Sequence, residues 1–345
     1  FSVVNIVGLA IGMAAALLIL TYVAFEYSYD DMHSRQDRIF RVEARFYENG
    51  ELTDDWASSS AGYATAMKQN MSAVEDYTRV GSQYYPEQVV KYNELLCRET
   101  GIGYAEANFF DFFDFKLLKG NKESCLDGPN KVVITERIAR KYFKGADPIG
   151  KILIFRSNIG EEACEVTGIM EDMPINTHIR YNLLISYKTL PKWMDEYWYR
   201  HEVYSYVLLK SANLKTQVEE DFPVMAEKYK TEEALKNKTW AIQLTNLRDI
   251  HLNPQKAYEP EVKGNRSSIW VLICTALAIL CIAWINYINM TVARSMERAK
   301  EIGIRRTSGA SRRQVISQFL FESLVTNSIA SVSYTHLRAH ETVLD

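Results

Sequence analysis

The chain has 345 residues, of which 47% are hydrophobic, and its formal net charge at pH 7 is −3. This length is enough for one or two domains with a hydrophobic core, and the balanced charge excludes the strongly basic composition of many nucleic-acid-binding proteins. No nucleic-acid partner is therefore expected, and the distribution of the charges along the chain is more informative than their sum.

Two uncharged stretches predict membrane-spanning helices. Residues 1–25 and 267–293 contain no charged side chain. A helix needs roughly 20 apolar residues to cross the hydrocarbon layer, and each charge at its centre would cost about 2.5–3.5 kcal/mol. A buried helix of a soluble protein is usually shorter and has a polar face. The first stretch also lacks the basic region and the cleavage site of a signal peptide.

Small residues recur at every fourth position of the first stretch. Gly8, Gly12 and Ala16 therefore fall on one face of the predicted helix. Such a stripe lets two helix backbones approach closely in a membrane. We expect this face to pack against another transmembrane helix.

The charges that flank the two stretches predict the orientation in the membrane. Residues 294–313 hold seven Lys or Arg residues against two acids, Glu297 and Glu301. The first stretch is followed by Glu26, Asp30 and Asp31. Because basic residues gather on the cytoplasmic side, we expect the segment after the second stretch to be cytoplasmic and the region between the stretches to be outside.

The region between the stretches predicts a mixed α and β domain. Its helices and strands alternate along the chain, which is typical of compact α/β lobes. Helices are predicted at residues 136–143 and 214–229, a helix followed by a strand at 28–50 and 63–80, and strands at 87–99, 101–110, 151–155, 164–170, 182–190, 204–210 and 240–246.

A glycine-rich stretch in this domain imitates a phosphate-binding loop. GADPIGK, residues 145–151, matches most of that motif, but Ile152 stands where a Ser or Thr must hold magnesium. A helix also precedes the loop and a strand follows it, whereas a phosphate loop leads from a strand into a helix N-terminus. We interpret the stretch as a turn between a helix and a strand.

The scattered histidines and acids give no catalytic or metal site. His33, His178, His201 and His251 have no carboxylate or cysteine at ligand spacing, so each is predicted to be a surface or locally hydrogen-bonded histidine. The acids of FFDFFDF, Asp111 and Asp114, are predicted to be turn residues rather than an acid/base pair. No enzyme activity, metal or cofactor is expected of this chain.

The cysteines do not form a disulfide framework. Cys97, Cys125 and Cys164 lie in the external region, where three cysteines can form at most one bridge. Cys274 and Cys281 lie seven positions apart in the second stretch and are expected to pack within it.

The two ends of the chain are expected to be artificial. The sequence begins at Phe1 rather than Met, which indicates a fragment. VSYTHLRAHET, which starts at Val332, resembles a translated sequencing adapter. Its histidine pair, His336 and His340, is therefore not interpreted as a metal site, and residues 332–345 are expected to be a scar.

The basic segment after the second stretch is predicted to be an elbow between two helices. Glu301 and Arg305 are four positions apart with the acid first, which favours a helix. Gly309 can end that helix in the left-handed conformation, and Ser311 with Gln314 forms a capping box that starts another.

The residues after the capping box predict the beginning of a third span. An alternative is that the basic segment is simply held by anionic lipid head groups. Lipid attraction would explain the charge, but it would not require a glycine turn next to a capping box. The apolar residues that fall on one face of the new helix are Val315, Ile316, Phe319 and Leu320.

These residues carry a family resemblance. EIGIRRTSGASRRQVISQFLFES, residues 301–323, is similar to the segment after the second span of FtsX/MacB-type ABC transporter permeases, in a Bacteroidetes-like style. The segments that resemble the first span and the periplasmic core of that family, in family order, are residues 5–42, 108–121, 132–151, 164–186 and 244–252.

The resemblance implies a role for the elbow. In that family the elbow docks on a cytoplasmic ATPase, and its movement is conveyed through the spans to the periplasmic domain. The ATPase-coupling residues implied by the match are Glu301, Ile302, Gly303, Arg305, Arg306, Gly309, Ala310, Ser311, Arg312, Arg313 and Gln314.

The fold class that follows is a membrane protein in which transmembrane helices flank a mixed α+β extracytoplasmic domain. The expected domains are helix 1 at residues 1–25, a MacB-like periplasmic core at 26–266, helix 2 at 267–293, the coupling elbow at 294–314, the truncated third span at 315–331 and the scar at 332–345.

The resemblance implies a permease subunit of an ABC transporter in a bacterial inner membrane, serving export or mechanotransmission. Its expected partners are a separate cytoplasmic ATPase, membrane lipid, a second permease half in a dimer or pseudo-dimer, and a periplasmic adaptor. Two alternatives remain open: a two-span receptor for an extracytoplasmic ligand, and an FtsX-like regulator of cell-wall hydrolases. The sequence does not identify a substrate.

Overall fold

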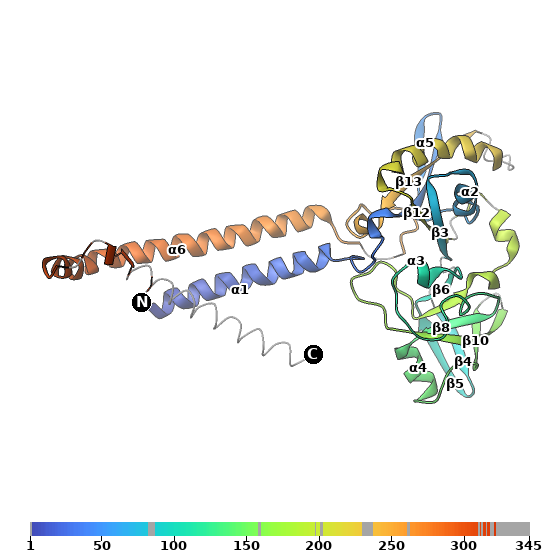
Figure 1. The fold of residues 1–345 in the computed structure, drawn as a ribbon, viewed down its shortest axis with the longest axis horizontal. Helices are drawn as coiled ribbons and strands as arrows, with labels where there is room; N and C mark the ends of the chain where they lie inside the picture. Colours follow the sequence, from blue (N-terminus) through green and yellow to red (C-terminus); the bar gives the residue numbers. More distant parts are fainter. Residues whose placement is uncertain are drawn as a thin grey trace. The chain divides into compact units, whose positions relative to one another are not determined.

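The computed structural model describes residues 2–81, 87–157, 160–196, 198–200, 203–229, 237–260 and 263–309, and then 311, 313, 314, 316, 317 and 321. The chain separates into a helical unit, Phe1–Tyr27 with Asn265–Asp345, and a mixed α/β unit, Ser28–Gly264. Figure 1 shows both units. The predicted third span lies largely outside the described residues, and the predicted scar lies entirely outside them.

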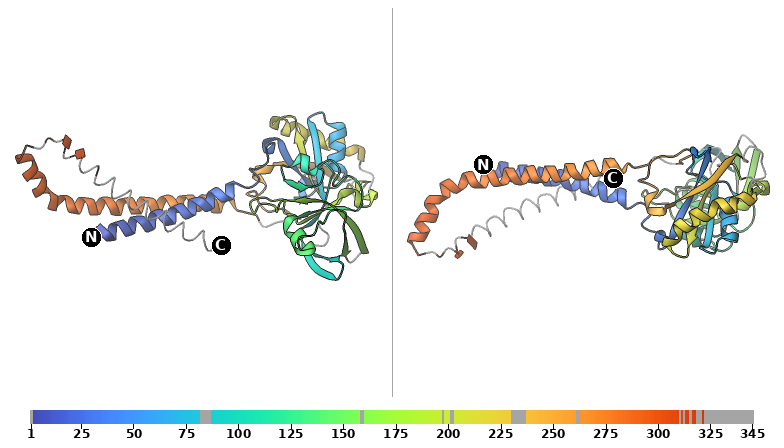
Figure 2. Two further views of the ribbon diagram at one scale, coloured as in Figure 1. Left: turned by 60° about the horizontal axis from the view of Figure 1, so that its bottom comes forward. Right: turned by 90° about the horizontal axis from the view of Figure 1, so that it is seen from above.

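The helical unit consists of two long helices, α1 (Ser2–Tyr27) and α6 (Arg266–Thr307), which lie side by side in Figures 1 and 2. Their segments Val7–Tyr27 and Arg266–Met290 are long and apolar enough to cross a membrane, with mean hydropathies of 2.3 and 2.5. Large apolar side chains on both helices are exposed, which suits lipid better than the core of a soluble protein. These side chains include Ile11, Leu18, Trp270, Ile282 and Trp284.

The stripe of small residues lies where α1 meets α6. A Cβ atom added to Gly12 would lie 3.1 Å from the Cβ of Ala283, and one added to Gly8 would lie 3.8 Å from the Nδ2 of Asn286. Ala16, one turn further along α1, is fully buried. A larger side chain at Gly12 would therefore push the helices apart. This geometry supports the proposed packing role of the stripe in a membrane.

The described strands of the α/β unit form one mixed sheet of 13 strands, in the order β13-β1-β12-β3-β6-β11-β8-β10-β9-β4-β5, with β2 paired to β1 and β7 to β10. The pairs β6–β11 and β8–β10 are parallel, and the other registered pairs are antiparallel. The strands are β1 (Ile39–Glu48), β2 (Glu51–Asp55), β3 (Val74–Gly81), β4 (Glu87–Tyr92), β5 (Leu95–Thr100), β6 (Ile102–Ala105), β7 (Leu117–Lys119), β8 (Lys131–Thr135), β9 (Ile152–Ser157), β10 (Gly160–Met170), β11 (Leu183–Ser186), β12 (Val203–Leu209) and β13 (Lys238–Asn246).

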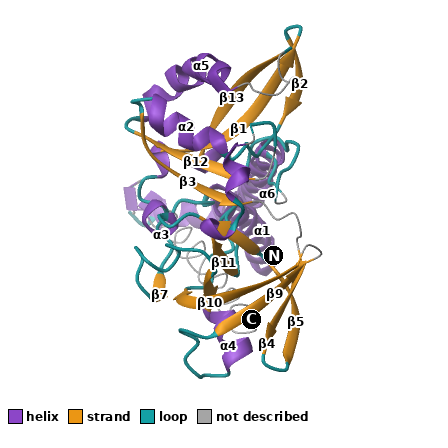
Figure 3. Cartoon of the chain, turned by 90° about the vertical axis from the view of Figure 1, so that its right-hand side faces the viewer, coloured by secondary structure: helices purple, strands orange, loops and turns teal. Residues whose placement is uncertain are grey.

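The sheet divides into two lobes with separate helices. In Figure 3, α2 (Gly62–Asn70) and α5 (Lys215–Ala226) lie near β13, β12 and β3, whereas α4 (Glu136–Phe143) lies near the other end of the sheet. The lobes meet between β3 and β6, where the described ladder registers Val80 opposite Ala105 and Gly81 opposite Tyr104. A short aromatic helix, α3 (Phe109–Phe112), fills the core between them.

Local signals explain α4 and the loop after it. The Oγ1 of Thr135 accepts a hydrogen bond from the backbone N–H of Ile138, which caps the helix, while Ile138 and Tyr142 are buried on one face. The helix stops at Lys144 in the left-handed conformation, and β9 begins at Ile152. The stretch GADPIGK thus runs from a helix into a strand, and its interpretation as a turn is confirmed.

Three strand predictions were wrong in detail. Residues 182–190 form β11 only as far as Ser186, and Tyr187–Thr189 form a 3-10 helix. Residues 87–99 form the hairpin of β4 and β5 rather than one strand, because Asn93 takes a left-handed conformation with φ 51° and reverses the chain. Residues 101–110 contain β6 but end in α3, because Phe109 and Phe110 are needed in the core, where a helical turn buries both.

Candidate coupling site and the roots of the membrane helices

The helix α6 ends in the turn predicted for the elbow. The backbone N–H of Ser308 still donates to the carbonyl oxygen of Ile304, at 3.0 Å, and Gly309 then adopts a φ of 93°. L-residues with a side chain rarely take this conformation, whereas glycine takes it without steric cost. Among the described residues, no atom lies within 4 Å of the position that a Cβ on Gly309 would take. The glycine is therefore required by the backbone and not by crowding.

A reciprocal cap follows the turn. The backbone N–H of Ser311 donates to the Oε1 of Gln314 at 2.9 Å, and the backbone N–H of Gln314 lies 3.4 Å from the Oγ of Ser311. These are the two bonds of a capping box. The described residues that follow, 313, 314, 316 and 317, are helical. The chain therefore turns within a few residues from one helix into the next.

The other predicted coupling residues are only partly described. Residues 301–306 belong to the last turns of α6, where Gly303 is exposed. The side chains of Glu301, Ile302, Arg305 and Arg306 lie outside the description, and so does their predicted ion pair. Ala310 and Arg312 lie outside the described residues altogether. Arg313, Ser311 and Gln314 are exposed.

The elbow also exposes apolar side chains that the sequence prediction did not include among the coupling residues. Ile304 is 67% exposed, Ile316 is 49% exposed and Phe321 is 67% exposed. Their place beside a basic segment is the signal that could have identified them, since apolar anchors within a charged rim are typical of protein interfaces. The described part of the elbow is therefore a surface of mixed apolar and basic character around a fixed turn.

The segment that follows α1, residues 28–38, is held by a buried carboxylate. Asp30 accepts a hydrogen bond from the Oγ1 of Thr177 at 2.6 Å, and its Oδ2 lies 2.7 Å from the Nδ1 of His178. Burial alone would raise the pKa of this carboxyl, but the charge and hydrogen bond of His178 outweigh burial, and the pKa lies below its usual value. The prediction that His178 is a surface or locally bonded residue was wrong, since its partner is 148 positions away.

His33 of the same segment and His251, which contacts the segment, are also buried. His33 lies between Phe113 and Phe115, and its Nδ1 accepts the backbone N–H of Asp114 at 3.1 Å. Burial lowers the pKa of His33 to about 4. His251 is also buried and stacks on Tyr29, at 3.4 Å between ring centroids. The surface prediction was thus wrong for these two residues as well, while His201 lies outside the described residues.

The acids of the FFDFFDF motif were predicted to be turn residues, which was wrong: Asp111 lies in α3, and Asp114 lies in the irregular segment that follows the helix. Asp114 accepts hydrogen bonds from the backbone N–H and the Oγ of Ser34, and the carbonyl oxygen of Asp111 accepts from Arg35. Both residues therefore fix the segment after α1 to the end of α3.

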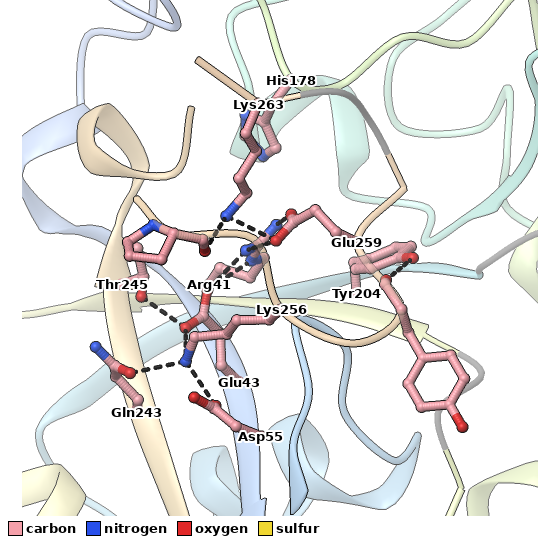
Figure 4. Close-up of polar contacts among 12 residues, drawn as sticks. Arg41, Glu43, Asp55, His178, Tyr204, Gln243, Thr245, Lys256, Glu259 and Lys263 are labelled. Carbon is pink, nitrogen blue, oxygen red and sulfur yellow. Dashed lines mark hydrogen bonds and ion pairs between the residues drawn. The ribbon is translucent and has the colours of Figure 1, made fainter. Parts of the chain in front are cut away.

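The segment that precedes α6 is held by a buried ion network, shown in Figure 4. The guanidinium of Arg41 lies 2.7 Å from Glu43 and 2.7 Å from Glu259, and Lys263 lies 2.6 Å from Glu259. Lys256 extends the network to Glu43 at 2.9 Å. The side chains of Arg41 and Glu259 are fully buried. The network joins β1 to the last residues before α6.

Paired charges decide the ionisation of this network. Burial opposes the charge of Arg41, but Glu43 and Glu259 outweigh it and raise the pKa of the guanidinium. Burial also opposes ionisation of Glu43, whose pKa is nonetheless lowered by Arg41 and Lys256. Arg41 and Glu43 are therefore both charged near neutral pH, and each depends on the other for compensation.

The described residues contain no group of three or more His, Cys, Asp or Glu that could hold a metal ion. The five cysteines are all unbridged in the structure. The described arrangement consists of two helices of membrane length, a domain that lies between them in the sequence, and a glycine turn after the second helix.

This arrangement defines a membrane-anchored subunit with an external domain between two spans. Residues 2–223 match the family model of the MacB-like periplasmic core domain, and residues 273–333 match that of the FtsX-like permease C-terminal region. The chain belongs to the FtsX/MacB-type ABC transporter permease family, and it is a membrane protein with a periplasmic domain.

Curated relatives and a solved structure agree with this family. The chain is 26% identical over 236 residues to the macrolide export ATP-binding/permease protein MacB of Neisseria meningitidis, covering 67% of this chain and 33% of the relative. It is 25% identical over 285 residues to the probable syringafactin export ATP-binding/permease protein SyfD of Pseudomonas syringae, covering 79% of this chain and 40% of that relative. The chain thus spans about a third of the length of the first curated relatives that it matches.

The solved domain of a Porphyromonas gingivalis protein described as a permease superposes with a TM-score of 0.55 at 23% identity. The superposition covers 67% of this chain and 96% of the solved domain. This likeness shows that the two share a fold.

Proposed function

We propose that the chain is part of the permease subunit of an ABC transporter, multi-pass in a bacterial inner membrane, and that its elbow docks on a cytoplasmic ATPase. The observation that carries the proposal is the glycine turn at Gly309 joined to the capping box of Ser311 and Gln314 at the end of α6. Such a turn sets a fixed direction between two helices, as a docking element requires.

The length of α6 supports the transmission of movement. Its 42 residues correspond to about 63 Å of helix, roughly twice the thickness of the hydrocarbon layer. Because the helix is unbroken from Arg266 to Thr307, a displacement of the elbow would move its periplasmic end as well. We therefore propose that ATP-driven closure of the partner shifts the elbow and that α6 conveys the shift to the periplasmic domain.

The ATPase partner and the substrate are proposed only in general terms. The relatives are named as ATP-binding/permease proteins, so their ATP-binding part and permease part share one protein. We propose a separate ATPase subunit here, together with a second permease half, surrounding lipid and a periplasmic adaptor. Export of a periplasmic substrate is the proposed outcome.

Two other functions use the same architecture. A regulator of cell-wall hydrolases would keep the ATPase and the elbow but move no substrate. A two-span receptor would continue from α6 into a long signalling helix, and the turn at Gly309 argues against that continuation. The first alternative is separated from export by an assay for substrate movement.

The docking proposal is tested by photo-cross-linking in cells that express the intact permease with the ATPase encoded beside it. A cross-linking amino acid at Ile304, which is 67% exposed on the elbow, should capture the ATPase. The matched control is Val224, which is 74% exposed on the periplasmic domain and should capture none. Absence of an ATPase adduct from position 304 would contradict the proposal.

A further inference from the structure

The segments that connect the α/β unit to the two membrane helices are both anchored inside it. We call residues 28–38 the α1 root, and residues 254–260 with 263–264 the α6 root. At the α1 root the backbone N–H of Asp30 donates to the carbonyl oxygen of Asn176 at 3.0 Å. At the α6 root the backbone N–H of Ala257 donates to the carbonyl oxygen of Asp55 at 3.3 Å.

A series of buried polar contacts runs inward from the α1 root. The Oδ2 of Asp30 lies 2.7 Å from the Nδ1 of His178, and the Nε2 of His178 lies 2.9 Å from the hydroxyl of Tyr206. The side chains of Asp30 and His178 are almost completely buried. Tyr206 belongs to β12, so these contacts lead from the root into the sheet.

A second series runs inward from the α6 root and reaches the neighbouring position of the sheet. Lys263 lies 2.6 Å from Glu259, and Glu259 accepts two bonds from Arg41 of β1, at 2.7 and 3.3 Å. Arg41 stands directly opposite Tyr206 in the antiparallel β1–β12 ladder. Figure 4 shows His178 and Lys263 on the same side of this network. The two series therefore meet at the Arg41–Tyr206 pair.

Burial makes this path stiff. A charge that loses its partner inside a protein is strongly unfavourable, so the members cannot separate independently. The α1 root also contacts residues 248 and 251, which precede the α6 root, but these contacts are weaker candidates. Arg248 pairs with Asp31 while both side chains are about half exposed, and such pairs contribute little. The ring stack of Tyr29 on His251 carries no ion pair.

We propose that Asp30, His178, Tyr206, Arg41, Glu259 and Lys263 form a tie that couples the α1 root to the α6 root through β12 and β1. Arg41 and Tyr206 are its positioning residues, because each series ends on one of them. Loosening one root then loosens the other. Through the tie, the domain would respond to both membrane helices together, and this role rests on the proposed function. The contacts of the tie do not require an ATPase.

The test is hydrogen–deuterium exchange of the whole chain in lipid nanodiscs, with no ATPase present. Glu259→Gln removes one charge at the α6 root, and exchange should rise about tenfold or more in peptides of both roots, including the Asp30 amide. The amides of α4 in the distant lobe should not change. The matched control is Glu161→Gln, which breaks the exposed ion pair with Arg156 and should leave both roots unchanged.

The route is tested by a double variant. Tyr206→Phe removes the hydroxyl that contacts His178 but keeps the ring that packs on Phe113. In this background, Glu259→Gln should still raise exchange at the α6 root but should no longer raise it at the α1 root. If Glu259→Gln raises exchange at the α1 root equally with and without Tyr206→Phe, the coupling bypasses the tie. If Glu259→Gln alone raises exchange only at the α6 root, the two roots are not coupled, and the tie is also overturned.

If Glu259→Gln unfolds the domain, the proposal is tested with the single variant Tyr206→Phe. It should raise exchange in both roots with α4 unchanged, and a rise in one root only would overturn the tie. This outcome is separate from the fate of the proposed function. If the two roots are coupled but the chain binds no ATPase, the tie stands and the proposed function fails. If the chain binds an ATPase but its roots are not coupled, the proposed function stands and the tie fails.

Discussion

Acidification should weaken the α/β unit through His33. The imidazole is buried against Phe113 and Phe115, and burial lowers its pKa from 6.5 to about 4. His33 is therefore neutral in the folded protein at pH 5, while it is protonated in the unfolded chain. Since the unfolded state binds more protons between these two pKa values, the free energy of unfolding falls as the pH falls from about 6.5 to about 4.

The size of the effect follows from the shift. One pKa unit corresponds to about 1.4 kcal/mol, so the displacement of His33 corresponds to a loss of about 3 kcal/mol across that window. Below about pH 4 this contribution is constant. Buried carboxylates then contribute: the pKa of Asp30 is lowered in the fold, and its stabilising contribution is lost as the pH falls below about 3.8. The two residues therefore act in separate pH windows.

The assay is urea unfolding of residues 28–264 at a series of pH values, followed by tryptophan fluorescence. His33→Asn supplies an oxygen that can accept the N–H of Asp114, as the Nδ1 of His33 does, but it cannot titrate. The variant should be less stable at pH 7 because it loses ring packing, yet its stability should be nearly flat from pH 6.5 to 4. If wild type and His33→Asn lose stability in parallel over that window, the assignment to His33 is refuted.

Three further predictions concern local elements and topology. Thr135→Ala should lower the stability of the domain by about 0.5–2 kcal/mol, because Thr135 caps α4, and a reduced urea midpoint with an unchanged slope would be the readout. The isolated domain should bind no ATP by calorimetry, before or after Lys151→Ala, because GADPIGK leads into a strand; binding that the variant abolishes would contradict the turn assignment. In intact cells, an impermeant maleimide should label Glu123→Cys, which is exposed on the α/β unit, but not Ser311→Cys in the elbow, and labelling at residue 311 would reverse the topology.

The parts of the fold that sequence reasoning predicted depend on local signals. The uncharged stretches, the amphipathic face of Ile138 and Tyr142, and the Ser311 cap each lie within a few residues of the structure that they specify. Periodicity and capping act over such distances, so they can be read from one sequence. The hairpin at Asn93 was missed because a single asparagine inside an apolar run is a weak turn signal.

The anchoring of the two roots could not be predicted, because it depends on residues distant in sequence. Asp30 meets His178 across 148 positions, and Arg41 meets Glu259 across 218 positions. Spacing rules compare neighbours, so they treated these histidines as isolated. Arg41, Glu43 and Arg45 alternate along β1 and therefore share one face of the strand, but the pairing of Arg41 with Glu259 of the α6 root follows only from the tertiary fold.

The central claim is that the fixed turn of the elbow couples an ATPase to the periplasmic domain, and one comparison tests it most directly. Gly309→Val forces a β-branched residue to a φ of 93°, and Gly50→Val imposes nearly the same strain at a φ of 83° in the turn between β1 and β2. In the described part of the chain, neither position has a heavy atom within 4 Å of the new Cβ. The two variants therefore carry the same kind of backbone strain at different positions in the chain.

The measurement is ATPase co-purification together with the ratio of transport to ATP hydrolysis, in the intact permease assembled with its ATPase in membrane vesicles. We predict that Gly309→Val inserts into the membrane normally but loses co-purification or hydrolyses ATP without transport, while Gly50→Val behaves as wild type. Unchanged co-purification and an unchanged ratio in Gly309→Val would contradict the claim, and the basic elbow would then be better explained as a segment held by anionic lipid.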